Sequence, residues 1–259
     1  MTSIASSDNP RLRRWQRLAR DAGARRSEKS ALIEGAHLVA ACIDSRTALK
    51  CLIVSKSGAQ RQEVAALSER WGKTPVVLAD GLFRLIADTE TPAGIAAEIA
   101  IPGAMPELAS AGACVFLEGI QDAGNVGTIL RSACAFGIRH AVLGPGCADA
   151  WSPKVLRAGM GAHFAMAILE NADLADAIGR FGGKLVCTAP SGGVALAAAD
   201  LSGRIGWLLG AEGRGVSDAL AACAALKVTI PMPGGAESLN VAAAAAICFY
   251  ELSRRGARA

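Results

Sequence analysis

A strand end, a loop and a helix start follow one another in Ile230-Pro-Met-Pro-Gly-Gly-Ala-Glu-Ser-Leu-Asn-Val241. The apolar residues from Ala224 to Ile230 predict a short buried strand, which the two prolines end because proline lacks the amide proton of a sheet ladder. The alanine run that follows predicts a helix, with Ser238 as its expected N-cap. Ligands often bind at such a joint in an open α/β sheet, but a plain strand–turn–helix connection explains the stretch equally well.

The same order of strand, loop and helix recurs upstream in the C-terminal half. Strands are predicted at Cys114–Leu117, Ala141–Leu143, Leu185–Cys187 and Ile205–Leu209. A helix is predicted from Val126 to Phe136, with Asn125 as its cap. This alternation predicts an α/β fold with a mostly parallel sheet covered by helices.

The N-terminal third predicts a second, smaller α/β domain. Its helices are expected at Pro10–Ala22, Leu32–Cys42 and Gln62–Trp71, and its strands at Cys51–Val54, Pro75–Leu78 and Gly94–Ile99. A segment rich in proline and glycine, 101–106, is the expected linker. The predicted domains are therefore 1–105 and 106–259, and both sizes lie within the usual domain range.

Charge is concentrated at the N-terminus of the 259-residue chain. The formal net charge of the whole chain is +4, but residues 1–30 hold eight basic and three acidic side chains. Such a segment suits binding to a phosphate backbone, although a solvated helix face is the simpler explanation of this feature alone.

The cysteines and histidines predict no metal site. None of the eight cysteines belongs to a C-x-x-C pair, and the three histidines lack ligand spacing. Buried thiols in a reducing cytoplasm are the expected state of the cysteines. No apolar run approaches the roughly 20 residues of a membrane span, so no membrane contact is expected.

Glycine-rich loops follow several of the predicted strands. Neither G-x-G-x-x-G nor G-x-x-x-x-G-K-[ST] occurs, which disfavours a dinucleotide oxidoreductase or a P-loop enzyme. The loops carry Asn125, Thr188, Glu212, Ser238 and Asn240 instead, a set suited to orienting a polar substrate.

Three motifs in the C-terminal half resemble motifs 1, 2 and 3 of the SpoU/TrmH family of SPOUT RNA methyltransferases. They are Asn125-x-Gly-x-x-x-Arg131, Leu209-Gly-Ala-Glu-Gly-x-Gly215 and Ile230-Pro-Met-x-Gly…Ser238-Leu-Asn-Val241. The segment Trp151-Ser-Pro-Lys-Val-Leu-Arg157 is also similar to that family. In the N-terminal third, Ser6-x-x-Asn9-Pro10, Glu34-Gly35 and Thr91-Pro92-x-Gly94 resemble the family's L30e-like substrate-binding domain.

The resemblance implies a C-terminal SPOUT domain with a deep trefoil knot, a rare exception to the rule that chains do not thread. It implies a homodimer that methylates a ribose 2′-hydroxyl of structured RNA with S-adenosyl-L-methionine. Ribosomal RNA is the expected substrate; transfer RNA, or an inactive RNA-binding protein of the same fold, are the alternatives.

The site residues that the resemblance implies fall into three groups. The expected catalytic residues are Asn125, Arg131, Glu212 and Asn240. The expected cofactor-binding residues are Thr188, Gly210, Ile230, Met232, Ser238 and Leu239. The expected RNA contacts are Arg11, Arg14, Lys154 and Arg157. An arginine stays protonated in proteins, so Arg131 is expected to stabilise developing negative charge rather than to act as a base.

Overall fold

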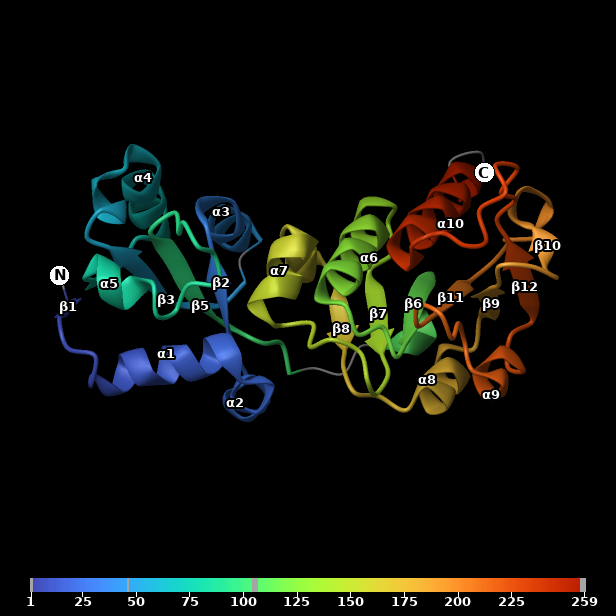
Figure 1. Cartoon of the computed structure of the whole chain (residues 1–259), viewed down its shortest axis with the longest axis horizontal. Coiled ribbons are helices and arrows are strands. Elements are labelled where there is room, and N and C mark those ends of the chain that lie inside the picture. The colour runs from blue at the N-terminus through green and yellow to red at the C-terminus, as the bar shows by residue number, and fades with distance from the viewer. Residues whose placement is uncertain (1, 46, 104–106, 257–259) are drawn as a thin grey trace. The chain divides into compact units, whose positions relative to one another are not determined.

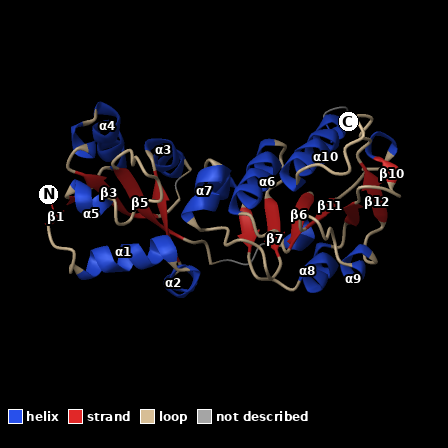
Figure 2. Ribbon diagram, viewed as in Figure 1, coloured by secondary structure: helices blue, strands red, loops and turns tan. Residues whose placement is uncertain are grey.

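The computed structural model describes residues 2–45, 47–103 and 107–256, which form two compact units (Figures 1 and 2). Unit 1 comprises Met1–Ala104 and Trp151–Phe164, and unit 2 comprises Met105–Ala150 and Ala165–Ala259. The predicted domain boundary, between 105 and 106, lies outside the described residues.

Unit 1 is built on a five-stranded mixed sheet in the order β1-β4-β3-β5-β2. Strands β1, β4 and β3 are parallel, whereas β5 runs antiparallel to both β3 and β2. The strands are β1 Thr2–Ile4, β2 Ser30–Glu34, β3 Leu49–Ser55, β4 Val76–Leu78 and β5 Ile95–Ala100. The helices are α1 Pro10–Arg20, α2 Ala22–Glu28, α3 Ala36–Asp44, α4 Gln62–Trp71, α5 Asp80–Phe83 and α7 Pro153–Gly159, with 3₁₀ turns at Gly58–Gln60 and Ala162–Ala165.

Helix α1 forms where the sequence predicts a helix, but it is shorter. Asn9 caps it by accepting a hydrogen bond from the Arg11 amide, and the buried stripe Leu12, Trp15 and Leu18 anchors it to the sheet. It ends at Arg20 because Asp21 adopts an extended conformation and caps α2.

The helix predicted over Leu32–Cys42 is wrong in its first turn. Residues Ser30–Glu34 form strand β2, whose buried side chains and backbone pair with β5. Gly35 then turns with φ 97°, a conformation that favours glycine, and α3 begins at Ala36. Tertiary pairing overrode the local helical spacing here.

Unit 2 contains a seven-stranded, fully parallel sheet in the order β10-β12-β9-β11-β6-β7-β8. The strands are β6 Ala113–Glu118, β7 His140–Leu143, β8 Ala167–Leu169, β9 Lys184–Thr188, β10 Val194–Ala195, β11 Ile205–Gly210 and β12 Leu226–Thr229. The helices are α6 Ala123–Ala135, α8 Leu174–Phe181, α9 Asp218–Ala221 and α10 Val241–Gly256, with 3₁₀ turns at Leu108–Ser110 and Leu196–Ala198.

The sheet of unit 2 is covered on both faces, as the buried strands predict. Helices α6 and α10 lie on one side of it and α8 and α9 on the other (Figure 2). Phe116 of β6 packs edge to face against Phe181 of α8, and Trp207 of β11 packs against Phe249 of α10. The predicted α/β class and parallel sheet are confirmed, while the trefoil knot stays a prediction.

Candidate active site

Three polar loops follow neighbouring strands of unit 2. They leave β6 at Glu118, β11 at Gly210 and β12 at Thr229. These strands and β9 are parallel neighbours, so their carboxyl ends meet at one edge of the sheet. This edge is where open α/β sheets bind ligands.

The loop after β11 is a tight hairpin. Ala211 and Gly215 form an antiparallel bridge, with the Gly215 amide donating to the Ala211 carbonyl at 2.8 Å. The chain returns so closely that a Cβ on Gly210 would lie 2.1 Å from the Gly215 carbonyl carbon. Only glycine fits at Gly210, and the hairpin fixes where Glu212 stands.

Asn125 does not cap α6, contrary to the prediction. The helix begins at Ala123, three residues earlier than predicted, and Asp122 is its cap, with a carboxylate oxygen that accepts from the Asn125 amide at 2.8 Å. Asn125 therefore lies in the first helical turn, and its side-chain amide points to another partner.

Asn125, Glu212 and Asn240 form a closed cluster. Glu212 Oε1 accepts from Asn125 Nδ2 at 2.8 Å and from Asn240 Nδ2 at 2.9 Å. Asn240 Nδ2 also donates to Asn125 Oδ1 at 3.0 Å. The fold thus brings together three of the four predicted catalytic residues, which are up to 115 residues apart in sequence.

Asn240 also replaces Ser238 as the cap of α10. Its Oδ1 accepts from the Ala242 amide at 3.0 Å and from the Ala243 amide at 3.3 Å. The side chain of Asn240 therefore caps α10 through Oδ1 and binds Glu212 through Nδ2, so the two roles coexist in one residue.

Arg131 stands apart from this cluster. It is an exposed residue of α6, six positions or about 9 Å along the helix axis from Asn125. Among the described residues, none hydrogen-bonds or ion-pairs with its guanidinium. The side chain is available to a ligand.

A cavity of about 680 Å³ lies between the β6–α6 loop and the 211–217 loop. Asn125 and Glu212 are on its wall, together with Glu118, Gln121, Arg214 and Ser217. Its volume falls within the range of small-molecule sites. Glu118 is a site residue that was not predicted from the sequence. It ends β6 and accepts from the Ser217 amide at 2.8 Å, and its position at a strand end was the available signal.

The six predicted cofactor residues lie on three segments at the same sheet edge. Thr188 ends β9, Gly210 ends β11, and the other four belong to the loop between β12 and α10. One backbone hydrogen bond, from the Gly235 amide to the Met232 carbonyl, lies within the described loop 230–239. Its unpaired amides and carbonyls fit a ligand such as S-adenosyl-L-methionine, whose adenine and amino-acid moieties offer complementary polar groups.

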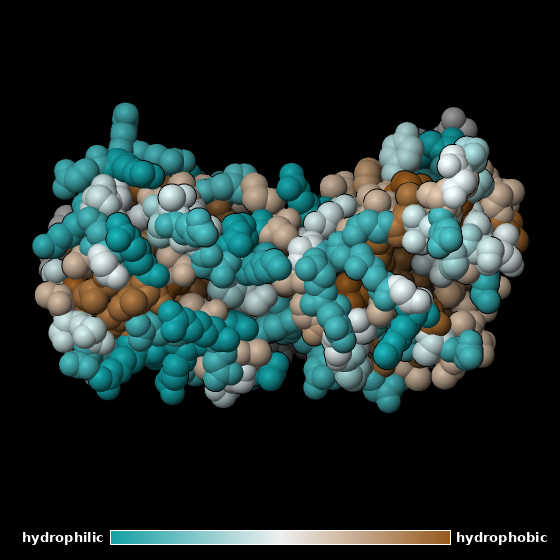
Figure 3. Space-filling model, viewed as in Figure 1, coloured by the Kyte–Doolittle hydropathy of each residue, from teal (hydrophilic) through white to brown (hydrophobic). Residues whose placement is uncertain are grey.

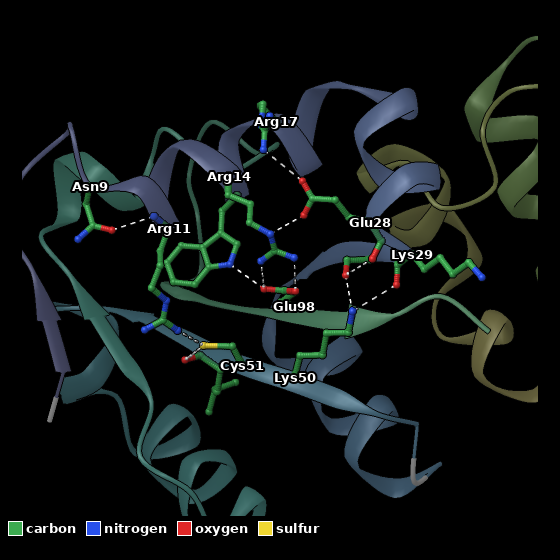
Figure 4. A network of polar contacts seen from close by, with 12 residues as sticks. Asn9, Arg11, Arg14, Arg17, Glu28, Lys29, Lys50, Cys51 and Glu98 are labelled. Atoms are coloured by element: carbon green, nitrogen blue, oxygen red, sulfur yellow. Dashed lines mark hydrogen bonds and ion pairs between the residues drawn. The ribbon is translucent and has the colours of Figure 1, made fainter. Parts of the chain in front are cut away.

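Two of the predicted RNA-binding arginines are engaged within unit 1 (Figure 4). Arg14 forms a bidentate pair with the buried Glu98, both hydrogen bonds at 2.8 Å, and also contacts Glu28. Arg11 lies over the Trp15 ring at 5.1 Å and donates to Cys51 Sγ. The surface over α1 is nevertheless largely hydrophilic (Figure 3).

Glu98 is the carboxylate at the centre of this network. It is 5% exposed and also accepts from Trp15 Nε1 at 2.9 Å. Burial raises the pKa of Glu98, but the hydrogen bonds from Arg14 and Trp15 outweigh burial and hold the pKa below its usual range. Arg14 therefore has a structural role whether or not it touches RNA.

The other two predicted RNA contacts lie on α7. Arg157 forms an ion pair with Asp88, and Lys154 is exposed. Pro153 at the first helical turn and Ser152 as N-cap explain why the Ser-Pro-Lys sequence starts a helix.

Family models match both parts of the chain. The SpoU rRNA Methylase family matches residues 112–250, and the MRM3-like substrate binding domain matches residues 9–97. The chain therefore belongs to the SpoU rRNA Methylase family. The family and the enzyme class predicted from the three motifs are confirmed.

Individual relatives are similar over nearly the full length. The chain is 34% identical to the 23S rRNA (guanosine(2553)-2'-O)-methyltransferase RlmP of Bacillus subtilis, covering 97% of this chain and 99% of the relative. A putative RNA methyltransferase of the TrmH family from Porphyromonas gingivalis is 34% identical with a TM-score of 0.81, covering 97% and 99%. An AdoMet-bound rRNA methyltransferase from Sinorhizobium meliloti is 28% identical with a TM-score of 0.83, covering 98% of both chains.

The described residues contain neither a group of three or more side chains suited to a metal nor a helix long and apolar enough to cross a membrane.

Proposed function

We propose that this enzyme transfers the methyl group of S-adenosyl-L-methionine to a ribose 2′-hydroxyl of ribosomal RNA. The observation that carries the proposal is the Asn125–Glu212–Asn240 cluster, which stands at the sheet edge where the three motif loops meet. A full-length relative that acts on 23S rRNA supports the choice of RNA.

The cofactor supplies an electrophilic methyl group when it is bound. The chain's part is to hold it with Thr188, Gly210 and the loop from Ile230 to Leu239, which line one edge of the sheet. An AdoMet-bound structure of a relative supports this assignment.

Arg131 supplies positive charge near the reacting hydroxyl. A ribose hydroxyl is a weak nucleophile, and negative charge grows on its oxygen as it attacks. The guanidinium of Arg131 is exposed and has no partner among the described residues, so it is suited to stabilise that charge or to hold a neighbouring phosphate. Asn125 and Asn240 hold the side chain of Glu212 in place by donating hydrogen bonds to its Oε1.

The two predicted domains divide the work: residues 1–105 bind the RNA and residues 106–259 carry the reaction. The match of 9–97 to a substrate binding domain supports this division. Basic residues with no partner among the described ones, such as Arg20 and Arg26, are better RNA contacts than Arg14.

A homodimer is the proposed assembly, and the cytoplasm is the proposed location. Helix α10 exposes an apolar stripe of Ala243, Ile247 and Tyr250, of which Ile247 is 40% and Tyr250 53% exposed. A stripe of this kind suits burial against a second copy. All eight cysteines are free thiols, which suits a reducing compartment.

A methyl-transfer assay tests the function. Purified enzyme would receive labelled S-adenosyl-L-methionine and either ribosomal or transfer RNA that lacks modification, with Arg131→Ala alongside. We expect label in ribosomal RNA, at linkages that resist alkali, and at least a 100-fold lower kcat in the variant because charge stabilisation is lost.

Three results would contradict the proposal. They are no transfer to any RNA by an enzyme that binds the cofactor, label in transfer RNA alone, and label at linkages that alkali cleaves. Asp176→Asn, which alters only an exposed pair with Arg180 on α8, serves as the control and should keep full activity.

A further inference from the structure

Three arginines form a row on the outer side of helix α1. Arg13, Arg17 and Arg20 follow the spacing i, i+4, i+7, which places them within about 60° of one another on a helix of about 3.6 residues per turn. The buried stripe that anchors α1 to the sheet lies on the opposite side of the helix. The arginine row extends about 10 Å along the helix axis, from Arg13 to Arg20.

All three guanidiniums of the arginine row can receive a ligand. The side chains of Arg13 and Arg17 are 63% and 64% exposed, and their carboxylate partners are Asp8 and Glu28. A guanidinium carries five N–H donors, so each of these ion pairs leaves most of the donors unused. Arg20 is exposed and has no partner among the described residues.

The backbone that carries the arginine row is fixed at both ends. Asn9 caps the first turn of α1, and Arg14 forms a bidentate pair with Glu98 of the sheet. At the other end, the buried Arg25 of α2 donates to the Leu18 carbonyl at 2.6 Å. The helix is therefore ordered before a ligand arrives, which lowers the entropy cost of binding.

The arginine row is suited to phosphate groups rather than to nucleobases. Guanidinium groups bind phosphate oxygens in pairs, and a 10 Å row can meet about two or three phosphates of one strand. Base recognition commonly uses aromatic side chains as stacking platforms. Residues 10–28 contain one aromatic side chain, Trp15, which is 1% exposed. Contacts of this kind fix where an RNA lies but do not read its sequence.

The placement of charge along α1 favours a ligand over a solvated helix face. Residues 1–30 carry a net charge of +5, while the rest of the chain is close to neutral. Arg17 and Arg20 lie in the last turn, where cations stabilise a helix. Arg11 and Arg13 lie near the N-terminal end, where cations are unfavourable, and the first turn contains no acidic residue. Helix stability alone therefore does not explain the row.

We propose that the arginine row of α1 docks the phosphate backbone of an RNA stem; this rests on the proposed function. The row positions the stem on unit 1 and contributes to RNA affinity, whereas the methyl-transfer step takes place in unit 2. Arg17 keeps its pair with Glu28, because Glu28 is also held by Arg14. Arg13 exchanges the exposed Asp8 for a phosphate.

Removing the three charges together tests the proposal. The full-length protein carrying Arg13→Gln, Arg17→Gln and Arg20→Gln would be titrated against an RNA duplex of about 20 base pairs, at salt concentrations between about 50 and 200 mM. We expect Kd to rise at least about thirtyfold at 0.1 M salt, and the slope of log affinity against log salt to fall by about two to three. The KM for ribosomal RNA should rise in parallel, while kcat stays within twofold of the wild type.

Three further variants serve as controls. Lysine at the same three positions keeps the charge and should keep most of the affinity and the salt slope. Arg61→Gln, Arg70→Gln and Lys73→Gln together remove the same charge around α4, across the sheet from α1 (Figure 1), and should bind like the wild type. Asp8→Asn frees Arg13 and should tighten binding about twofold.

The outcomes distinguish the arginine row from the proposed function. A wild type that binds the duplex through the row but methylates no RNA contradicts the function and leaves the row intact. The row is overturned if the folded glutamine variant keeps the Kd or the salt slope of the wild type, if its loss falls on kcat alone, or if the lysine variant loses as much affinity. If the glutamine variant does not fold, unchanged affinity in Asp8→Asn overturns the row. Displacement of the duplex by poly-L-glutamate at equal charge would assign the row to an acidic protein surface instead.

Discussion

At the scale of single residues, one buried carboxylate organises the basic N-terminal segment. Glu98 lies on strand β5 and accepts hydrogen bonds from Arg14 and Trp15 of α1 (Figure 4). A buried charge is tolerated only when it is paired and hydrogen-bonded, and Glu98 satisfies both conditions. The network therefore fastens α1 to the sheet in one register.

Glu98→Gln should lower the free energy of unfolding at pH 7 by about 2–3 kcal/mol, because charged hydrogen bonds become neutral ones. The pKa of Glu98 is lowered in the folded protein, so its stabilisation is present above the unfolded value of 4.5 and is lost as the pH falls through the folded value. The deficit of the variant should therefore shrink at acidic pH.

Denaturant unfolding followed by circular dichroism at pH 7 and at lower pH measures this difference. Glu69→Gln, at an exposed position of α4, is the matched control and should unfold like the wild type. Equal stability of Glu98→Gln and wild type at pH 7 would show that the network contributes nothing.

At the scale of elements, the longer buried strands were predictable, but β2 was predicted as a helix and β1, β8 and β10 were not predicted. Helix starts were also less accurate. The helix Gln62–Trp71 formed as predicted, and strand β11 begins where expected, because its buried apolar run has one compatible structure. The start of α6 was missed because Asp122 and Asn125 are both good caps. The sequence alone does not choose between these two caps; in the structure the side chain of Asn125 bonds instead to the distant Glu212 and Asn240.

The residues of the candidate site were predictable from the sequence, but their contacts with one another were not. The motifs identified Asn125, Glu212 and Asn240 as functional, but not that their side chains bond to one another. Contacts across 115 residues depend on how strands are ordered in the sheet, and spacing in sequence does not contain that order.

The hairpin after β11 should be sensitive to a single added methyl group at Gly210. Gly210→Ala places a Cβ 2.1 Å from the Gly215 carbonyl carbon, so the backbone must shift. We expect the displaced loop to weaken S-adenosyl-L-methionine binding at least tenfold and to cost about 1–3 kcal/mol of stability. Isothermal titration and thermal unfolding measure the two effects.

Gly179→Ala is the control for this substitution. Gly179 lies in α8, where an added Cβ meets no atom within 4 Å, and alanine favours a helix. Cofactor affinity should be unchanged in that variant. Unchanged affinity in Gly210→Ala as well would remove the β11 loop from the proposed cofactor site.

At the scale of the whole molecule, two units with separate cores share one chain. Each has its own sheet, and each matches a different family model. The exposed apolar stripe of α10, in which Tyr250 also packs edge to face on Phe136, belongs to the unit that carries the proposed reaction. Its inner face packs on α6 and the sheet, so the outer stripe is free to bury apolar area against a second copy.

Ile247→Glu should therefore shift the protein from dimer to monomer. The new carboxylate would be buried without a partner, a cost of about 3–5 kcal/mol, which corresponds to roughly a hundredfold or greater rise in the dimer dissociation constant. The fold should survive, because Ile247 is already 40% exposed in the single chain. Sedimentation velocity across a range of concentrations measures the shift, and circular dichroism verifies the fold.

Ala66→Glu adds the same charge to an exposed position of α4 and should leave the assembly unchanged. If the wild type sediments as a monomer at all concentrations, or Ile247→Glu remains dimeric, α10 is not the interface.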